Sequence, residues 1–338
     1  MDWLLLLLSL VVILGGAELF TNGVEWVGEG FGLSEGAVGS VLAAIGTALP
    51  ETLLPLVAIF GGHAAGKEIG IGAILGAPFM LSTLAFCAFA ITVLLGARRG
   101  SRSREIEHDP GVIQQDMRFF LAMYGAAFVA GIVPVFALHV ALVPFLLVGY
   151  GVYVRHRLRG ASGDREGQEA VGEVRMLRFA RLFRRPSPPT MALSLTQTLL
   201  ALVVLIVGAE LFVRVVEQLS SALGVSELMF SLLVAPVATE LPEAMNASVI
   251  WARRGKDVLA LGNVAGAMVF QSVFPVSLGL LFTPWRLDTV SGAAAVIALV
   301  AAAIVLITAR VRGRLDARLL ALQGLLWVGY VVFVLRRI

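Results

Sequence analysis

The chain has 338 residues, of which 58% are hydrophobic and 14% are charged, and its formal net charge is +3 at pH 7. A membrane-spanning helix needs about 20 mostly apolar residues, and stretches of that length cover most of this sequence, which indicates a polytopic helical membrane protein. The single cysteine excludes an internal disulfide, and one cysteine with four scattered histidines gives no soft-metal cluster. The excess of positive charge is grouped between apolar stretches, which is typical of membrane topology rather than of nucleic-acid binding.

Apolar stretches predict about ten membrane-spanning helices in chain order. We expect them at 4–20, 37–60, 69–95, 119–137, 140–154, 193–215, 228–251, 258–282, 290–309 and 315–335. The first stretch has the leucine run of a signal peptide, but a signal peptide begins with positive charge and only Asp2 precedes this run. We therefore expect 4–20 to be retained as a span.

The longest polar segment, 155–191, separates a first half (1–154) from a second half (192–338). Four of its arginines lie along one side of a short helical pattern: Arg175, Arg178, Arg181 and Arg185. This pattern fits an interfacial helix on anionic lipid, or a basic cytoplasmic loop that only fixes topology, and both interpretations stay open.

The two halves of the chain repeat one another. Gly-Ala-Glu-Leu-Phe occurs at 16–20 and again 192 residues later, and beyond the next loop a shift of 190 aligns Ser82 with Ser272. Since each half holds five predicted spans, an odd number, the second half must start on the opposite side of the membrane. We therefore expect two inverted five-helix repeats.

The distribution of Lys and Arg gives an independent prediction of topology. Of the 26 Lys and Arg residues, 21 lie in four segments on one side of the predicted fold: 98–118, 155–185, 252–257 and 310–318. The positive-inside rule places these segments in the cytoplasm and both termini outside. We expect a multi-pass protein of the cell membrane.

One motif stands at matching places in the two halves: Gly-Thr-Ala-Leu-Pro-Glu at 46–51 and Ala-Thr-Glu-Leu-Pro-Glu at 238–243. An ionisable group within a span is costly and indicates a functional site. Thr47 and Glu51 are four residues apart, as are Thr239 and Glu243, so hydroxyl and carboxylate share a helical face. The proline of each motif leaves a carbonyl without its helical partner, so we expect the second and seventh helices to be interrupted. Hydroxyl, carboxylate and carbonyl oxygens are ligands for small cations.

Inverted repeats with broken helices are the architecture of many secondary transporters, whose sites lie at the repeat interface. Glu51 and Glu243 would face one another there, and two close carboxylates raise one another's proton affinity unless a cation lies between them. The third and eighth spans, which carry Gly72-x-x-x-Gly76 and Gly262-x-x-x-Gly266 for close packing, would complete the site. Their polar candidates are Ser82, Asn263, Gln271 and Ser272. These side chains also serve as hydrogen-bonding links between helices, and this alternative stays open.

In these motifs the chain resembles the sodium/calcium exchanger superfamily of cation antiporters. That family has two inverted repeats, each with Gly-Thr-Ser-Leu-Pro-Glu followed by Gly-Asn-x-x-Gly-Ser-Asn, and the resemblance covers nearly the whole chain. It implies that Glu51 and Glu243 coordinate the transported ion together with Thr47 and Thr239. It also implies exchange of calcium or a related cation against sodium, potassium or protons.

The chain departs from this family pattern at several ligand positions. Ala48 and Glu240 stand in place of the motif serines, and the Gly-Ser-Asn triplets are replaced at 76–78 and 266–268. Leu81 and Gln271 stand where similar exchangers often have Asn or Asp. We hypothesise that Glu240, three residues from Glu243 and on nearly the same helical face, replaces a lost acidic ligand.

The sequence thus predicts a cation antiporter, exchanging calcium for sodium or protons by alternating access. Alternatives are a proton-coupled exchanger of another divalent or monovalent cation, and a relative that does not transport. An intramembrane hydrolase is disfavoured because every Asp lies at a loop or helix end and no Ser/His or metal-ligand set occupies a span. We expect no enzyme activity and no cofactor. The expected partners are inorganic cations and membrane lipids, without nucleic acid or an obligatory protein partner.

Overall fold

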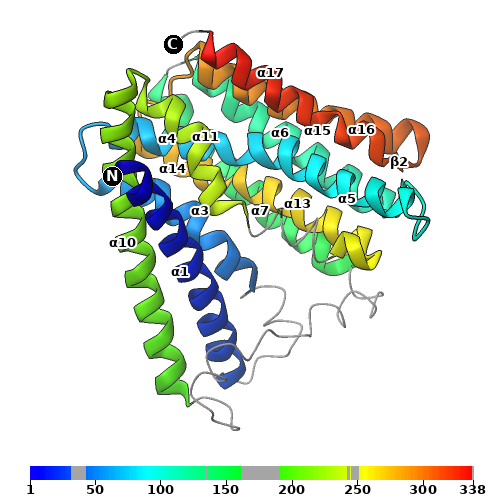
Figure 1. Ribbon diagram of the computed structural model, residues 1–338, viewed down its shortest axis with the longest axis horizontal. Helices are drawn as coiled ribbons and strands as arrows, with labels where there is room; N and C mark the ends of the chain where they lie inside the picture. The colour runs from blue at the N-terminus through cyan, green and yellow to red at the C-terminus, as the bar shows by residue number, and fades with distance from the viewer. Residues whose placement is uncertain (32–42, 134, 161–189, 242–243, 245–250, 337–338) are drawn as a thin grey trace.

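A computed structural model of the chain describes residues 1–31, 43–133, 135–160, 190–241, 244 and 251–336. The described chain is nearly all helical (Figure 1). The first half contains α1 (Asp2–Gly30), α3 (Ala43–Phe60), α4 (Gly66–Met80), the π-helix η2 (Leu81–Ala85), α5 (Phe86–Arg98), α6 (Pro110–Ile132) and α7 (Phe136–Gly160). The second half contains α10 (Met191–Leu223), α11 (Glu227–Thr239), the 3-10 helix η5 (Ala252–Arg254), α13 (Asp257–Gln271), α14 (Phe274–Phe282), α15 (Thr289–Arg312), α16 (Ala317–Ala321) and α17 (Gln323–Leu335).

Seven helical stretches of the described residues are long and apolar enough to cross a membrane. They are Asp2–Gly28, Gly66–Arg98, Phe136–Arg157, Met191–Leu223, Asp257–Phe282, Thr289–Val311 and Ala317–Leu335. Pro50–Phe60 and Glu227–Val237 are shorter apolar helices. The predicted basic loop at 155–191 lies largely outside the described residues.

The predicted starts of the fourth and fifth spans were wrong. α6 begins at Pro110, nine residues before the predicted start at 119, and α7 begins at Phe136 instead of 140. The cause is at the start of α6, where the Asp109 carboxylate accepts hydrogen bonds from the amides of Gly111 and Val112. An acidic N-cap followed by proline is a strong helix start, and hydropathy alone does not register it.

The first helices of the two halves, α1 and α10, pack side by side and run antiparallel (Figure 1). Three α1 glycines spaced seven residues apart make the close approach possible. A Cβ on Gly16 would lie 3.0 Å from Cγ of Leu205, and one on Gly23 would lie 2.5 Å from Oγ1 of Thr198. Gly30 lies against Met191, so the contacts run in opposite directions along the two helices.

Reciprocal contacts join α1 and α10 at equivalent positions. Gly16 lies against Leu205, and Gly208 lies against Ile13, with Cγ1 of Ile13 3.0 Å from the place of a Cβ on Gly208. A shift of 192 residues converts the first pair into the second. Each glycine thus accommodates a large aliphatic residue from the other helix.

The third span meets the seventh through the glycines that the sequence marks for close packing. A Cβ on Gly72 would lie 2.4 Å from the carbonyl oxygen of Leu228, and one on Gly76 would lie 2.3 Å from that of Leu232. The buried Ser231 hydroxyl donates to the carbonyl of Ile69 at 2.8 Å. Close packing is therefore confirmed at Gly72 and Gly76.

The equivalent glycines of the eighth span, Gly262 and Gly266, have no described atom within 4 Å of an added Cβ. Gly72 and Gly76 contact Leu228 and Leu232 of the second half. The equivalents of these two leucines in the first half, at 36–40, lie outside the described residues.

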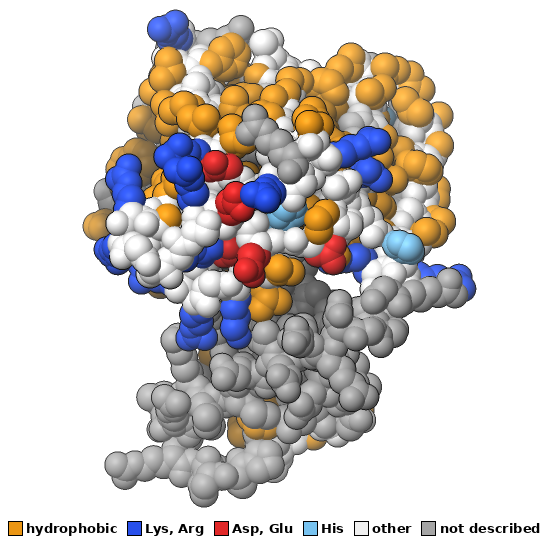
Figure 2. All heavy atoms as spheres, turned by 90° about the vertical axis from the view of Figure 1, so that its right-hand side faces the viewer, with side chains coloured by type: hydrophobic (Ala, Val, Ile, Leu, Met, Phe, Trp, Pro, Cys, Tyr) orange, Lys and Arg blue, Asp and Glu red, His pale blue; other side chains and the backbone are white. Residues whose placement is uncertain are grey.

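At one end of the molecule the loops of the two halves are tied together. β1 (Glu105–Ile106) pairs antiparallel with β2 (Leu315–Asp316). Arg102 forms an ion pair with buried Asp257 at the start of α13 and donates to the carbonyl of Ala252 at 2.7 Å. Figure 2 shows Lys and Arg side chains gathered over this end, beside a hydrophobic surface. The predicted concentration of positive charge at one end is visible there.

Candidate cation site

The seventh span is interrupted at its motif, as predicted. α11 ends at Thr239, and Glu240 follows as its C-cap, with its amide donating to the carbonyl of Pro236 at 2.8 Å. The prediction for the second span was wrong, because α3 continues from Ala43 to Phe60 through its motif. A proline inside a helix removes one amide donor, and membrane helices tolerate this where neighbouring groups satisfy the freed carbonyl.

Two further interruptions, which the sequence reading missed, lie at equivalent places in the third and eighth spans. The third span changes from α-helix to the π-helix η2 at Leu81, and the eighth breaks between α13 and α14 after Gln271. These residues are aligned by the 190-residue shift. Pro78 before the first break and Pro275 at the start of α14 are the sequence signals that mark them. Single π-turns inside helices occur frequently at functional sites.

The ends of α11 and α13 are joined by a buried carboxylate. Glu240 is 0% exposed, and its Oε1 accepts hydrogen bonds from Nε2 of Gln271 at 2.9 Å and from Oγ1 of Thr239 at 3.3 Å. The structure thus brings together three of the predicted site residues.

The amide orientation of Gln271 is set by this contact, because a carboxylate only accepts and the NH₂ group must face it. The carbonyl oxygen Oε1 of Gln271 then remains as an acceptor, and it has no hydrogen-bond partner among the described residues. A buried oxygen of this kind is available to a cation.

Glu51 comes from a neighbouring helix and is also buried, with 5% of its surface exposed. Its helix, α3, contacts both α11 and α13. The side chain of Thr47 and all of Glu243 lie outside the described residues. The predicted approach of Glu51 to Glu243 therefore stays a prediction.

Three buried hydroxyls of the third and eighth spans donate to backbone carbonyls about one turn earlier. Ser82 and Thr83 donate to Phe79 at 3.2 and 2.5 Å, and Ser272 donates to Val269 at 2.7 Å. Their hydrogens are thus engaged, while the oxygen lone pairs can still face a cation. η2 contacts α13, so the two sets of hydroxyls lie on adjacent segments.

Asn263 and Gln271 lie at different heights along α13. The two residues are eight positions apart on α13, which corresponds to about 12 Å along a helix axis. A calcium ion contacts its oxygen ligands at only about 2.3–2.6 Å. One ion therefore cannot take both side chains, and the predicted ligand set falls into two levels.

The electrostatics of the site favour positive charge. Glu240 stands at the C-terminus of α11, where the helix dipole is negative and disfavours a carboxylate. A buried carboxylate also loses hydration, which costs several kcal/mol unless charge or hydrogen bonds compensate. The donors from Gln271 and Thr239 that contact Glu240 are neutral.

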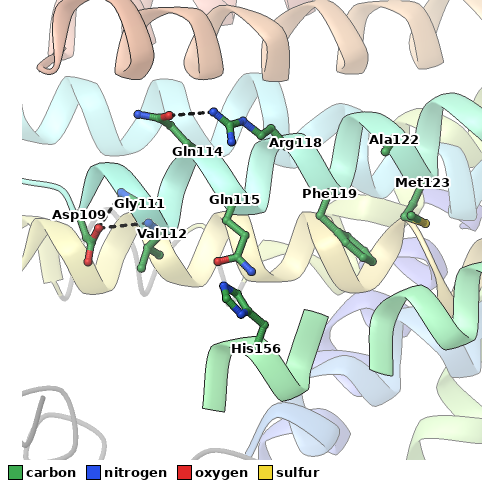
Figure 3. A pocket seen from close by; sticks show the side chains of 10 residues that line it. All are labelled: Asp109, Gly111, Val112, Gln114, Gln115, Arg118, Phe119, Ala122, Met123 and His156. Carbon is green, nitrogen blue, oxygen red and sulfur yellow. Dashed lines mark hydrogen bonds between the residues drawn. The ribbon is translucent and has the colours of Figure 1, made fainter. Parts of the chain in front are cut away.

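The pocket in Figure 3 lies away from these residues. It has a volume of about 670 Å³, follows α6 from Asp109 to Met123, and is closed on one side by His156 from α7. Arg118 in its wall donates to Gln114 at 3.2 Å. None of the predicted site residues lines this pocket, so it does not belong to the cation site.

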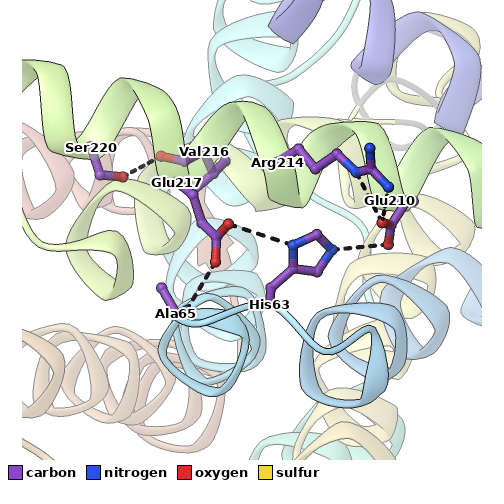
Figure 4. A network of polar contacts seen from close by, with 7 residues as sticks. All are labelled: His63, Ala65, Glu210, Arg214, Val216, Glu217 and Ser220. Atoms are coloured by element: carbon purple, nitrogen blue, oxygen red, sulfur yellow. Dashed lines mark hydrogen bonds and ion pairs between the residues drawn. The ribbon is translucent and has the colours of Figure 1, made fainter.

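A separate polar network links the loop between α3 and α4 to α10 (Figure 4). Nε2 of His63 lies 3.0 Å from Glu210 and its Nδ1 lies 3.5 Å from Glu217. Glu217 also accepts from the amide of Ala65 at 2.9 Å, and Arg214 binds Glu210 at 2.9 Å. This network fixes the connection between the second and third spans.

The family model of the sodium/calcium exchanger protein matches residues 1–159 and 193–337 of this chain. An uncharacterized membrane protein of Methanocaldococcus jannaschii is 27% identical over 291 residues, which cover 86% of this chain and 85% of that protein. Among solved structures, the crystal structure of the H⁺/Ca²⁺ exchanger CAX is similar, with a TM-score of 0.71, 17% identity, and coverage of 98% of this chain and 82% of that one.

The structure of the sodium-calcium exchanger NCX_Mj is also similar, with a TM-score of 0.58, 22% identity and 98% of each chain covered. At these identities the two structures show a shared fold. The family match spans both halves of the chain and leaves out residues 160–192 and the last residue. The chain therefore belongs to the sodium/calcium exchanger protein family.

Proposed function

We propose that this chain is a secondary active antiporter that exchanges calcium for protons or sodium by alternating access around Glu51 and Glu243. The observation that carries the proposal is the buried Glu240 carboxylate at the interrupted end of α11, bonded to Gln271 of α13. Interrupted helices with carboxylates and unwound carbonyls are how many transporters hold cations near the membrane centre. The proposal makes the chain a transporter and not an enzyme.

The packing of α1 on α10 supports two inverted five-helix repeats. These helices occupy equivalent places in the two halves, and they run antiparallel with reciprocal glycine contacts. The interruptions at equivalent places in the third and eighth spans also support two repeats. We infer ten spans, divided into 1–154 and 192–338, with 155–191 as a basic cytoplasmic loop and both termini outside.

The proposed ion ligands are oxygen atoms from four interrupted or kinked spans. Three carboxylates, Glu51, Glu240 and Glu243, supply negative charge, and the neutral oxygens come from Thr47, Thr239, Gln271, Ser82 and Ser272. Hard oxygen ligands of this number suit a calcium-sized cation. Asn263, one level away along α13, would contact an ion during entry or exit.

Protons are the co-ion that the described residues favour. A carboxylate binds a cation best when it is ionised, so binding of a proton and binding of a cation oppose one another. The site has gained the carboxylate of Glu240 where the family motif has a serine, and it has lost the Asn of both Gly-Ser-Asn triplets. The second candidate function is a proton-coupled exchange of another divalent or monovalent cation on the same scaffold.

Binding of calcium-45 to the purified protein in detergent tests the ligand assignment. The variants Glu51→Gln, Glu240→Gln and Glu243→Gln should each weaken binding, because each removes a carboxylate that we propose as an ion ligand. Glu105→Gln is the matched control, since Glu105 is exposed in β1 and forms an exposed ion pair with Arg314. If Glu240→Gln binds calcium as the wild type does, Glu240 is no ligand. If all three bind normally, the site lies elsewhere.

A further inference from the structure

Three arginines from separate segments surround a small pocket at the end of the molecule shown in Figure 2. The pocket has a volume of about 280 Å³ and is lined by Leu94, Ala97, Arg98, Arg104 and Arg318. Arg98 ends α5, Arg104 precedes β1, and Arg318 lies in the first turn of α16. Among the described residues, no carboxylate lines it.

These arginines are held near one another by the backbone. The amide of Ala317 donates to the carbonyl of Arg104 at 3.2 Å, directly beside the β1–β2 pairing. The amide of Arg318 donates to Asp316 at 2.8 Å, and α16 packs on α5. The positive side chains therefore belong to a fixed arrangement and not to a loose tail.

The three guanidinium groups differ from those of Arg102 and Arg314 at this end of the molecule. Arg102 is paired with Asp257, and Arg314 is paired with Glu105 at 3.0 Å. Arg98, Arg104 and Arg318 make no side-chain hydrogen bond or ion pair with any residue that the structure describes. Their donors are thus available for an anion, and guanidinium groups bind phosphate oxygens particularly well.

Below the pocket, the helix faces become apolar. Residues spaced by three, four or seven share one face of a helix. Arg98 shares its face of α5 with Leu94 and with Ile91, which is 46% exposed. Beyond Arg318, Leu322 caps the end of α16 and Leu325 lies in the first turn of α17, and they are 55% and 64% exposed. An amphiphile with a phosphate head and aliphatic tails would match both parts of this surface.

We propose that this pocket binds the phosphate headgroup of an anionic phospholipid, whose acyl chains lie along Ile91, Leu322 and Leu325. Basic pockets between membrane helices are where such headgroups bind. The site is independent of the proposed transport function, because none of the candidate cation ligands contributes to it.

Native mass spectrometry of the full-length protein in detergent, titrated with phosphatidylglycerol, tests the proposal. The triple variant Arg98→Gln, Arg104→Gln, Arg318→Gln should bind phosphatidylglycerol at least about tenfold more weakly. The control triple variant Arg253→Gln, Arg254→Gln, Arg310→Gln removes the same charge from exposed arginines outside the pocket and should bind as the wild type does. Equal binding by both triple variants would overturn the proposal.

Competition on the wild-type protein separates the possible sources of the phosphate and does not depend on any variant folding. Neither phosphatidylcholine nor inorganic phosphate should displace bound phosphatidylglycerol at matched concentration. Displacement by inorganic phosphate would make this a site for the free anion, and displacement by phosphatidylcholine would make it a nonspecific lipid contact. Either result contradicts the proposal.

Discussion

Gln271 donates from its Nε2 to Oε1 of Glu240 at 2.9 Å, and this hydrogen bond connects the end of α13 to the end of α11. Both side chains are buried, and both helices stop within one residue of the contact. The bond therefore orients a carboxylate at the point where two spans lose their regular structure. It leaves Oε1 of Gln271 without a hydrogen-bond partner among the described residues.

Replacing Gln271 by leucine should weaken cation binding more than it weakens the fold. The variant removes the donor that orients Glu240 and an oxygen that we assign as a ligand. Gln323→Leu is the matched control, because Gln323 is equally buried and donates to Ala301 at 3.0 Å, away from the carboxylates. Both variants should lose about 1–3 kcal/mol of stability, measured by thermal unfolding in detergent. An unchanged calcium affinity in Gln271→Leu would contradict its role as a ligand.

Arg102→Ala should destabilise the protein strongly. It leaves Asp257 buried without its charge partner, and removing one member of a buried ion pair costs about 3–5 kcal/mol. Arg314→Ala should cost less than about 1 kcal/mol, because the Arg314–Glu105 pair is 73% and 56% exposed. The melting temperatures of the two variants provide the comparison, and equal losses would show that Arg102 does not anchor the start of α13.

Gly76→Ala should disturb the packing of α4 on α11. The added Cβ would lie 2.3 Å from the carbonyl oxygen of Leu232, so the helices must separate, at a cost of about 1–3 kcal/mol. Gly125→Ala on α6 is the control, since nothing lies within 4 Å of an added Cβ there. A melting temperature lowered only in the Gly76 variant is expected. If Gly76→Ala melts at the wild-type temperature, the contact is looser than the structure shows.

His63→Ala should loosen the loop between α3 and α4. His63 connects this loop to Glu210 and Glu217 of α10, and each lost hydrogen bond to a charged group is worth about 1.5–3 kcal/mol at most. Hydrogen–deuterium exchange of the peptide around His63 should increase. His156→Ala, which alters an exposed histidine on α7, should leave that peptide unchanged. Equal exchange in both variants would contradict the link.

Much of the fold could be predicted from sequence because hydropathy and the internal repeat report directly on spans. The family and the close packing at Gly72 and Gly76 were predicted and are confirmed. The glycine contacts of α1 with α10 were missed, although Gly16, Gly23 and Gly30 recur every seven residues. A hydropathy average does not reveal such a row of glycines, because glycine is neither strongly apolar nor strongly polar.

The residue types of the proposed site could be read from the sequence, whereas the contacts among them could not. The motif indicated Glu240 as a candidate, whereas its bond to Gln271 joins residues 31 positions apart and depends on how two helices end. The continuity of α3 through Pro50 was not predictable from the motif either, because α11 ends at Thr239, the threonine of the same motif in the other half. Tertiary packing decides between a kink and a break.

Calcium uptake into proteoliposomes is the most direct test of the proposed antiport. Purified protein would be reconstituted and given an outward proton gradient, an outward sodium gradient or no gradient, with Glu51→Gln and Glu243→Gln as inactive variants and Glu105→Gln as control. We predict uptake that is driven by the proton gradient, is retained in the Glu105 variant and is lost in the other two. Calcium uptake that ignores both gradients, or that persists in Glu51→Gln and Glu243→Gln, would contradict antiport around these carboxylates.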